Sequence, residues 1–261
     1  MAVEALRDEE QGWPDPGEIE ARARALRVLN RSGIPFLVAG AYALFEYTGI
    51  YRDTKDLDVM LVKGNLERAL QNLAAAGFRT EVRDRRWLAK AWAGDHFIDL
   101  IFASSNGLVP VDEGWFDHAP QAVVLGQRCR LVPAEEMIWS KGYVGSRERY
   151  DGADINHLIL TCGAQLDWHR LLARFGPHWE LLLSHLILFG FVYPCERAII
   201  PRWVMEELIR RLAAQPPMTS SVCRGNLLSP AAYEHDYERW GFLPEQGSEG
   251  SIPGQHDDEG T

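Results

Sequence analysis

Three aspartates placed in apolar segments are the residues of this sequence best suited to chemistry. Asp56 and Asp58 flank Leu57, and Asp99 interrupts the apolar run of residues 96–102. In a strand, residues i and i+2 point to the same face, so Asp56 and Asp58 would stand together. Neighbouring carboxylates repel each other and are costly to desolvate. A hard divalent cation such as Mg²⁺, which takes oxygen ligands from carboxylates and substrate phosphates, would offset that cost.

A simpler interpretation of the D-x-D pattern needs no metal. Asp56 would begin the strand in water, and Asp58 would pair with Lys55 or Arg52; surface acids are common, which favours this interpretation for an isolated D-x-D. Asp99 favours the metal site instead, because an Asp within an apolar strand is rarely buried without a partner.

A glycine turn precedes the two neighbouring aspartates. The apolar run of residues 36–39 predicts a buried strand. Gly40 then permits a tight turn and a close approach of the backbone to a ligand. Small and aromatic residues from 41 to 47 follow at helical spacing. Backbone N–H groups at such a helix start can bind phosphate oxygens.

These features together resemble the nucleotidyltransferase superfamily (DNA polymerase beta-like fold). The resemblance is carried by Gly40-Ala41 before a short helix, Asp56-x-Asp58 on a strand and Asp99 on a later strand. The string R-x-T-x-D-x-D that ends at Asp58 is similar to the form in the small bacterial branch of AbiEii-type toxins, minimal nucleotidyltransferases and antibiotic-adenylylating enzymes. The family turn is usually Gly-Gly or Gly-Ser, so Ala41 is a departure that removes a hydroxyl and keeps the backbone N–H groups.

The resemblance implies an enzyme, a Mg²⁺-dependent nucleotidyltransferase that moves an NMP from an NTP such as ATP to a hydroxyl and releases pyrophosphate. It implies that Asp56, Asp58 and Asp99 are both the catalytic residues and the ligands of two Mg²⁺ ions. Gly40 and Ala41 would contact the phosphates. The residues that it places along the nucleotide in the second half of the chain are Lys141, Arg149, Asp151 and Asp154.

For the residues of the second half, the sequence also allows purely structural roles. Lys141 would be a cation at a helix C-terminus, which is favourable by itself. Asp154 would form a salt bridge with Arg147 or Arg149. Both interpretations remain open at this point.

The acceptor is not specified by the sequence: a small molecule, a protein hydroxyl or an RNA 3′ end would each serve. The basic run from residue 79 to 90 would form a rim for a triphosphate or RNA, or the exposed face of a hairpin. A different class of function is a non-catalytic binding module, such as an antitoxin-like partner protein. The altered turn after Gly40 favours the module, whereas the three mutually repelling carboxylates favour the enzyme. A purely structural protein explains none of the acid placement.

The periodicity of the chain predicts an α/β (α+β) fold, in which a mixed-sheet nucleotidyltransferase-like domain precedes a helical domain. The expected helices are residues 17–31, 65–76, 133–143, 168–175, 177–192, 201–214 and 231–240; the expected strands are 78–82, 86–92 and 96–102, with a hairpin at 122–131 and a loop at 104–117. The expected regions are a loose N-terminus (1–16), the α/β domain (17–132), the helical domain (133–214), a C-terminal extension that docks back (215–244) and a disordered acidic tail (245–261).

The composition of the 261 residues indicates a cytoplasmic protein without a membrane partner. Half of the formal charge of −10 belongs to the final stretch from residue 245, which has five acids and no Lys or Arg. The acidic body argues against indiscriminate nucleic-acid binding. Four widely spaced cysteines favour reduced thiols, and the first residues lack the apolar segment of a signal peptide. The most apolar run, residues 181–192, is too short to span a bilayer and predicts a buried helix.

Overall fold

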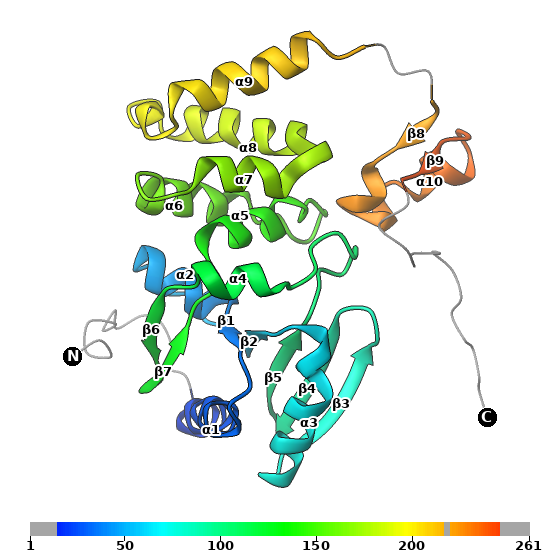
Figure 1. The fold of residues 1–261 in the computed structure, drawn as a ribbon. Coiled ribbons are helices and arrows are strands. Elements are labelled where there is room, and N and C mark those ends of the chain that lie inside the picture. Colours follow the sequence, from blue (N-terminus) through cyan, green and yellow to red (C-terminus); the bar gives the residue numbers. More distant parts are fainter. Residues whose placement is uncertain (1–14, 217–219, 246–261) are drawn as a thin grey trace.

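The computed structural model describes residues 15–216 and 220–245 (Figure 1). The helices are α1 (Pro16–Ser32), α2 (Gly40–Thr48), α3 (Leu66–Ala75), α4 (Glu113–His118), α5 (Ala134–Gly142), α6 (Gly152–Cys162), α7 (Trp168–Phe175), α8 (Trp179–Val192), α9 (Arg202–Ala213) and α10 (Glu234–Glu238). The strands are β1 (Leu37–Val38), β2 (Asp56–Met60), β3 (Arg79–Asp84), β4 (Leu88–Ala93), β5 (His96–Ile101), β6 (Gln121–Val124), β7 (Gln127–Arg130), β8 (Val222–Cys223) and β9 (Leu243–Pro244).

A five-stranded mixed sheet is the frame of the first half of the chain. Its strand order is β1-β2-β5-β4-β3, in which β2 and β5 are parallel and the other pairs are antiparallel. Helices α1 and α3 contact each other and the sheet, while α2 contacts β2 and, on its other side, α6 of the helical half. The mixed sheet followed by helices confirms the predicted α/β (α+β) fold class (Figure 1).

Alternation along β2 and β5 separates an apolar face of the sheet from a polar one. Leu57 and Val59 of β2 and Ile98 and Leu100 of β5 are fully buried in the core. Because side chains alternate along a strand, the residues between them point to the opposite face. The hydrophobic effect therefore orients both strands and leaves their carboxylates together on the other face.

The helical half stacks α5 to α9 in successive layers beyond the sheet (Figure 1). In the described residues, the stretch Trp168–Val192 is long and apolar enough by composition to cross a membrane. Buried residues of this stretch, such as Leu186 and Phe189, belong to the same hydrophobic core as the sheet. The prediction of a buried helix is correct for this side only, because Ile187 and Phe191 on the opposite side are 57% and 78% exposed.

Several predicted boundaries differ from the structure. The expected loop at 104–117 contains α4, whose Trp115 is fully buried and whose Phe116 is also in the core. The expected C-terminal helix is reduced to α10 and a preceding 3₁₀ turn. The four cysteines are unpaired, as expected. The predictions for residues 1–14 and for the tail from 246 lie outside the described residues.

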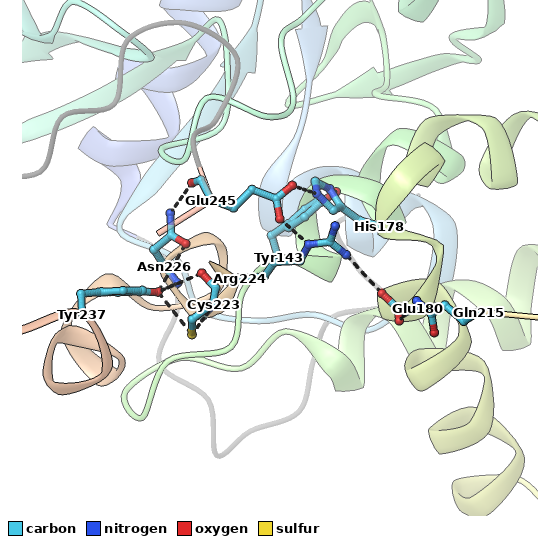
Figure 2. A network of polar contacts seen from close by, with 10 residues as sticks. Tyr143, His178, Glu180, Gln215, Cys223, Arg224, Asn226, Tyr237 and Glu245 are labelled. Atoms are coloured by element: carbon cyan, nitrogen blue, oxygen red, sulfur yellow. Dashed lines mark hydrogen bonds and ion pairs between the residues drawn. The ribbon is translucent and has the colours of Figure 1, made fainter. Parts of the chain in front are cut away.

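The C-terminal extension docks on the helical half through polar contacts (Figure 2). The Glu245 carboxylate lies 3.2 Å from Nε2 of His178, whose Nδ1 lies 2.8 Å from the Tyr143 hydroxyl. Arg224 forms ion pairs with both Glu245 and Glu180. The extension therefore bonds directly to residues at the start of α8, and His178 connects it to Tyr143 at the end of α5.

Candidate functional site

The three aspartates predicted to act together lie together on the polar face of the sheet. Asp58 of β2 and Asp99 of β5 are register partners in the parallel pair. Asp56 stands two residues before Asp58 on the same face. One carboxylate oxygen from each of the three lies within 4.8 Å of the others.

The Gly40 turn is in direct contact with this cluster. Gly40 opens α2 with φ +58°, and the Ala39 N–H donates to the Asp58 carbonyl oxygen at 2.9 Å. A Cβ atom on residue 40 would lie 1.9 Å from Oδ2 of Asp58, so only glycine leaves room for this carboxylate. Ala41, the departure from the family turn, is the next residue of the same helix start.

Asp58 has the most unusual electrostatic environment of the three. Its carboxylate forms no hydrogen bond or salt bridge with any described residue, so the alternative pairing with Lys55 or Arg52 is wrong. Burial, together with repulsion by Asp56 and Asp99, raises the pKa of Asp58 from 3.8 to about 7. A partly buried, unpaired carboxylate with such a pKa is an available ligand for a cation.

Asp99 differs from Asp58 because it already has a cation beside it. The Nζ atom of Lys90, on the neighbouring strand β4, lies 2.7 Å from Oδ1 of Asp99. Burial raises the pKa of Asp99, and the ion pair with Lys90 opposes this effect. The expectation that a buried Asp has a partner is therefore correct, and the partner belongs to the basic run of residues 79–90.

Asp56 is held by residues that the sequence reasoning did not select. The Thr54 hydroxyl donates to Oδ1 of Asp56 at 2.7 Å. The Thr54 carbonyl oxygen accepts from Arg22 at 2.8 Å, and Arg22 also donates to the Tyr42 hydroxyl at 2.8 Å. Arg22 is 1% exposed and links α1, the start of α2 and the approach to β2. The sequence offered one signal for these contacts, the Thr of the R-x-T-x-D-x-D string. Nothing in the sequence indicates that Arg22 contacts this Thr.

The second-half residues form a charged cluster where α5 ends and α6 begins. Lys141 donates to Asp151 at 2.8 Å and to Asp154 at 2.7 Å. Burial lowers the pKa of Lys141, and its attraction to Asp151 opposes this effect. Arg149 donates to both oxygens of Asp151, each at 3.1 Å.

Asp154 forms salt bridges with residues other than the two arginines suggested by the sequence. It pairs with Lys141 and with Arg52, which lies in the loop before β2, and not with Arg147 or Arg149. The Arg52 pair ties the loop that precedes the carboxylate strand to the helical half. Lys141 and Arg149 also lower the pKa of Asp58, so the two groups of charges act on one another electrostatically.

The basic run at 79–90 is mostly paired with acids of its own hairpin. Arg83 donates to Glu81 at 2.8 Å, and Arg86 forms three hydrogen bonds with the Asp84 carboxylate. These pairs are exposed and occupy the guanidinium groups that a phosphate would need. The interpretation as an exposed hairpin face therefore describes this run better than a basic rim does.

The donors present suit a hard divalent cation. Three carboxylates without any nitrogen or sulfur ligand are the set that Mg²⁺ prefers. Asp58 has no hydrogen-bond or ion-pair partner among the described residues, and the absence of a Cβ at Gly40 leaves room for its carboxylate. A separate open hollow of about 770 Å³ lies between α7 and α9, and none of the predicted site residues lines it.

Comparisons with known proteins find similarity among solved structures. No family model matches the chain, and no curated protein does. The antibiotic-resistance factor ANT(2'')-Ia is 20% identical with a TM-score of 0.47, and the match covers 66% of this chain and 98% of that protein. The lincosamide antibiotic adenylyltransferase LnuA with bound lincomycin is 14% identical with a TM-score of 0.40, over 53% of this chain and 94% of that one.

A third similar structure is an antigenic nucleotidyltransferase-like protein from Paracoccidioides brasiliensis. It is 16% identical with a TM-score of 0.38, over 65% of this chain and 92% of that protein. At these identities and TM-scores the similarity says nothing about the substrates or residue roles of this chain.

Proposed function

We propose that this protein is a nucleotidyltransferase, which transfers a nucleoside monophosphate from an NTP to a hydroxyl group and releases pyrophosphate. The observation that carries the proposal is the unpaired Asp58 carboxylate, held between Asp56 and Asp99 and against the Gly40 turn. Repelling carboxylates reduce stability unless a cation joins them, so a protein that gathers them has a use for that cation.

The proposed reaction exchanges a phosphoanhydride bond of the NTP for a phosphoester bond to the acceptor. The acceptor oxygen loses its proton and bonds to the α-phosphorus, while the bond between the α-phosphorus and the bridging oxygen breaks and pyrophosphate leaves. Mg²⁺, held by Asp56, Asp58 and Asp99, would supply charge neutralisation for the triphosphate and the leaving group.

The remaining steps belong to the chain itself. Asp99 would accept the proton of the acceptor hydroxyl, because Lys90 binds only its Oδ1 and burial raises its pKa. Gly40 and Ala41 would donate backbone N–H groups to phosphate oxygens at the start of α2. Lys141 and Arg149 would bring positive charge towards the phosphates, and Asp151 would hold both cations in position.

We infer a small molecule or a protein as the acceptor ahead of RNA. An RNA acceptor requires free basic groups along the path of its backbone. The arginines Arg79, Arg83 and Arg86 pair with Glu81 and Asp84 of their own hairpin. RNA labelling in the experiment below would contradict this inference on the acceptor but would leave the nucleotidyl transfer itself in place.

The test is an incubation of the protein with each of the four α-³²P-labelled NTPs, Mg²⁺ and a cell extract, followed by identification of the labelled product. We expect one or two of the NTPs to label an acceptor and Asp58→Asn to abolish the labelling. Asp95→Asn is the matched control, because Asp95 is exposed in the turn between β4 and β5. Labelling by the Asp58→Asn variant at the wild-type rate would refute the metal assignment.

A calorimetric titration separates this function from a non-catalytic binding module. We expect ATP or CTP to bind only when Mg²⁺ is present, and EDTA to abolish the binding. Absence of metal-dependent nucleotide binding, together with absence of labelling, would favour the module.

A further inference from the structure

Lys90 lies inside the carboxylate site and not on its rim. It stands on β4 directly opposite Asp99 of β5, whose other neighbour is Asp58 of β2. Three adjacent strands therefore present an ammonium group and two carboxylates in one row on the same face of the sheet.

The surroundings of Lys90 hold its ammonium group in one place. Its side chain is 17% exposed, and that of Asp99 is 11% exposed. The Nζ atom is 2.7 Å from Oδ1 of Asp99 and 3.8 Å from the centroid of the Phe97 ring, a cation–π contact. The arginines of the same hairpin differ, because Arg83 and Arg86 are more than half exposed and pair with acids of their own strand or turn.

We propose that Lys90 is a positioning residue of this site, an inference that rests on the proposed function. Its ammonium group binds one oxygen of Asp99, which fixes the carboxylate rotation and leaves Oδ2 for the cation or the acceptor proton. The same positive charge offsets part of the negative charge of the cluster. Lys90 thereby weakens the binding of a divalent cation while it orients the carboxylate that turnover requires.

These two effects predict opposite changes when the charge is removed. In Lys90→Met, the cluster becomes more negative, so we expect Mn²⁺ to bind about tenfold more tightly in the absence of nucleotide. The Asp99 carboxylate is free to rotate, so we expect the kcat of transfer to fall by about tenfold or more. A residue that only packed the sheet would lower metal affinity and stability together.

The experiment measures free Mn²⁺ by electron paramagnetic resonance, the thermal midpoint, and kcat and KM separately. Lys90→Arg keeps the charge and should return both the Mn²⁺ affinity and kcat to within about threefold of wild type. Lys90→Gln removes the charge and keeps a donor, so it tests the affinity change if Lys90→Met does not fold. Lys63→Met is the matched control, since the Lys63 ammonium lies 5.6 Å from the Phe102 ring centroid and outside the carboxylate cluster; we expect no change in any readout.

The results distinguish this inference from the function on which it rests. Unchanged or weaker Mn²⁺ binding in both Lys90→Met and Lys90→Gln would overturn the role of Lys90. Tighter Mn²⁺ binding with an unchanged kcat would overturn the positioning of Asp99. If the wild-type protein labels no acceptor at all, the proposed function fails, and the Mn²⁺ measurement still decides whether Lys90 controls the cluster.

Discussion

Replacing Gly40 by alanine tests the contact between the turn and the carboxylates. Residue 40 has φ +58°, a conformation that costs an alanine about 1–2 kcal/mol. The new Cβ would also lie 1.9 Å from Oδ2 and 2.8 Å from Cγ of Asp58, which are the movable end of that side chain. The carboxylate can rotate away at little further cost, so the clash should displace Asp58 without unfolding the protein.

The matched control for this variant is Gly33→Ala. Gly33 has φ +65°, and nothing lies within 4 Å of the position that a Cβ atom would take there, so it carries the same backbone cost without the clash. We expect urea denaturation to show a loss of about 1–2 kcal/mol for both variants. Only Gly40→Ala should lose metal-dependent nucleotide binding and at least about 100-fold in transfer rate, the scale of effect that follows from a 1 Å misplacement. Equal activities of the two variants would refute the idea that the turn positions Asp58.

Two further predictions concern charge. The pKa of Asp58 is raised in the folded state, so the folded protein retains a proton that the unfolded chain releases, and stability falls as the pH rises from 3.8 to about 7. Asp58→Asn should therefore be more stable than wild type at pH 8 by on the order of 2–4 kcal/mol, and the two proteins should be equally stable below pH 4. Urea denaturation without divalent cations measures this difference. Equal stability of the two proteins at pH 8 would contradict the raised pKa of Asp58. Lys141→Met leaves Asp151 and Asp154 with fewer cations, so it should cost about 2–4 kcal/mol of stability and raise the KM for the NTP. Arg202→Met is the control: it removes the exposed ion pair with Glu206 and should cost under about 0.5 kcal/mol.

The parts of the site that depend on local sequence patterns could be predicted from the sequence. Period-two alternation places Asp56 and Asp58 on one face, and an acid within an apolar run places Asp99 in a strand that needs a partner for it. A glycine that ends an apolar run predicts the turn. Each of these inferences uses residues that are neighbours along the chain.

The parts that depend on strand order could not be predicted. The sequence does not reveal that β5 lies between β2 and β4, and this order alone brings Lys90 to Asp99. The contact of Arg52 with Asp154 likewise joins residues about 100 positions apart, and its geometry depends on how α6 packs on α2. The role of Arg22 could not be predicted for the same reason. From the sequence alone an arginine is expected at the surface, and only its partners in the fold explain why Arg22 is buried.

The two-residue turn between β4 and β5 sets the alignment on which the cluster depends. Gly94, with φ +62°, and Asp95 join Ala93 directly to its register partner His96. A one-residue insertion in this turn would have one of two results. Either a β-bulge would absorb the extra residue, or the register of β5 would shift by one residue, which would turn Asp99 into the core and Leu100 to the opposite face. A length change in this turn that shifts the register would thus remove Asp99 from the cluster while every aspartate of the sequence is still present.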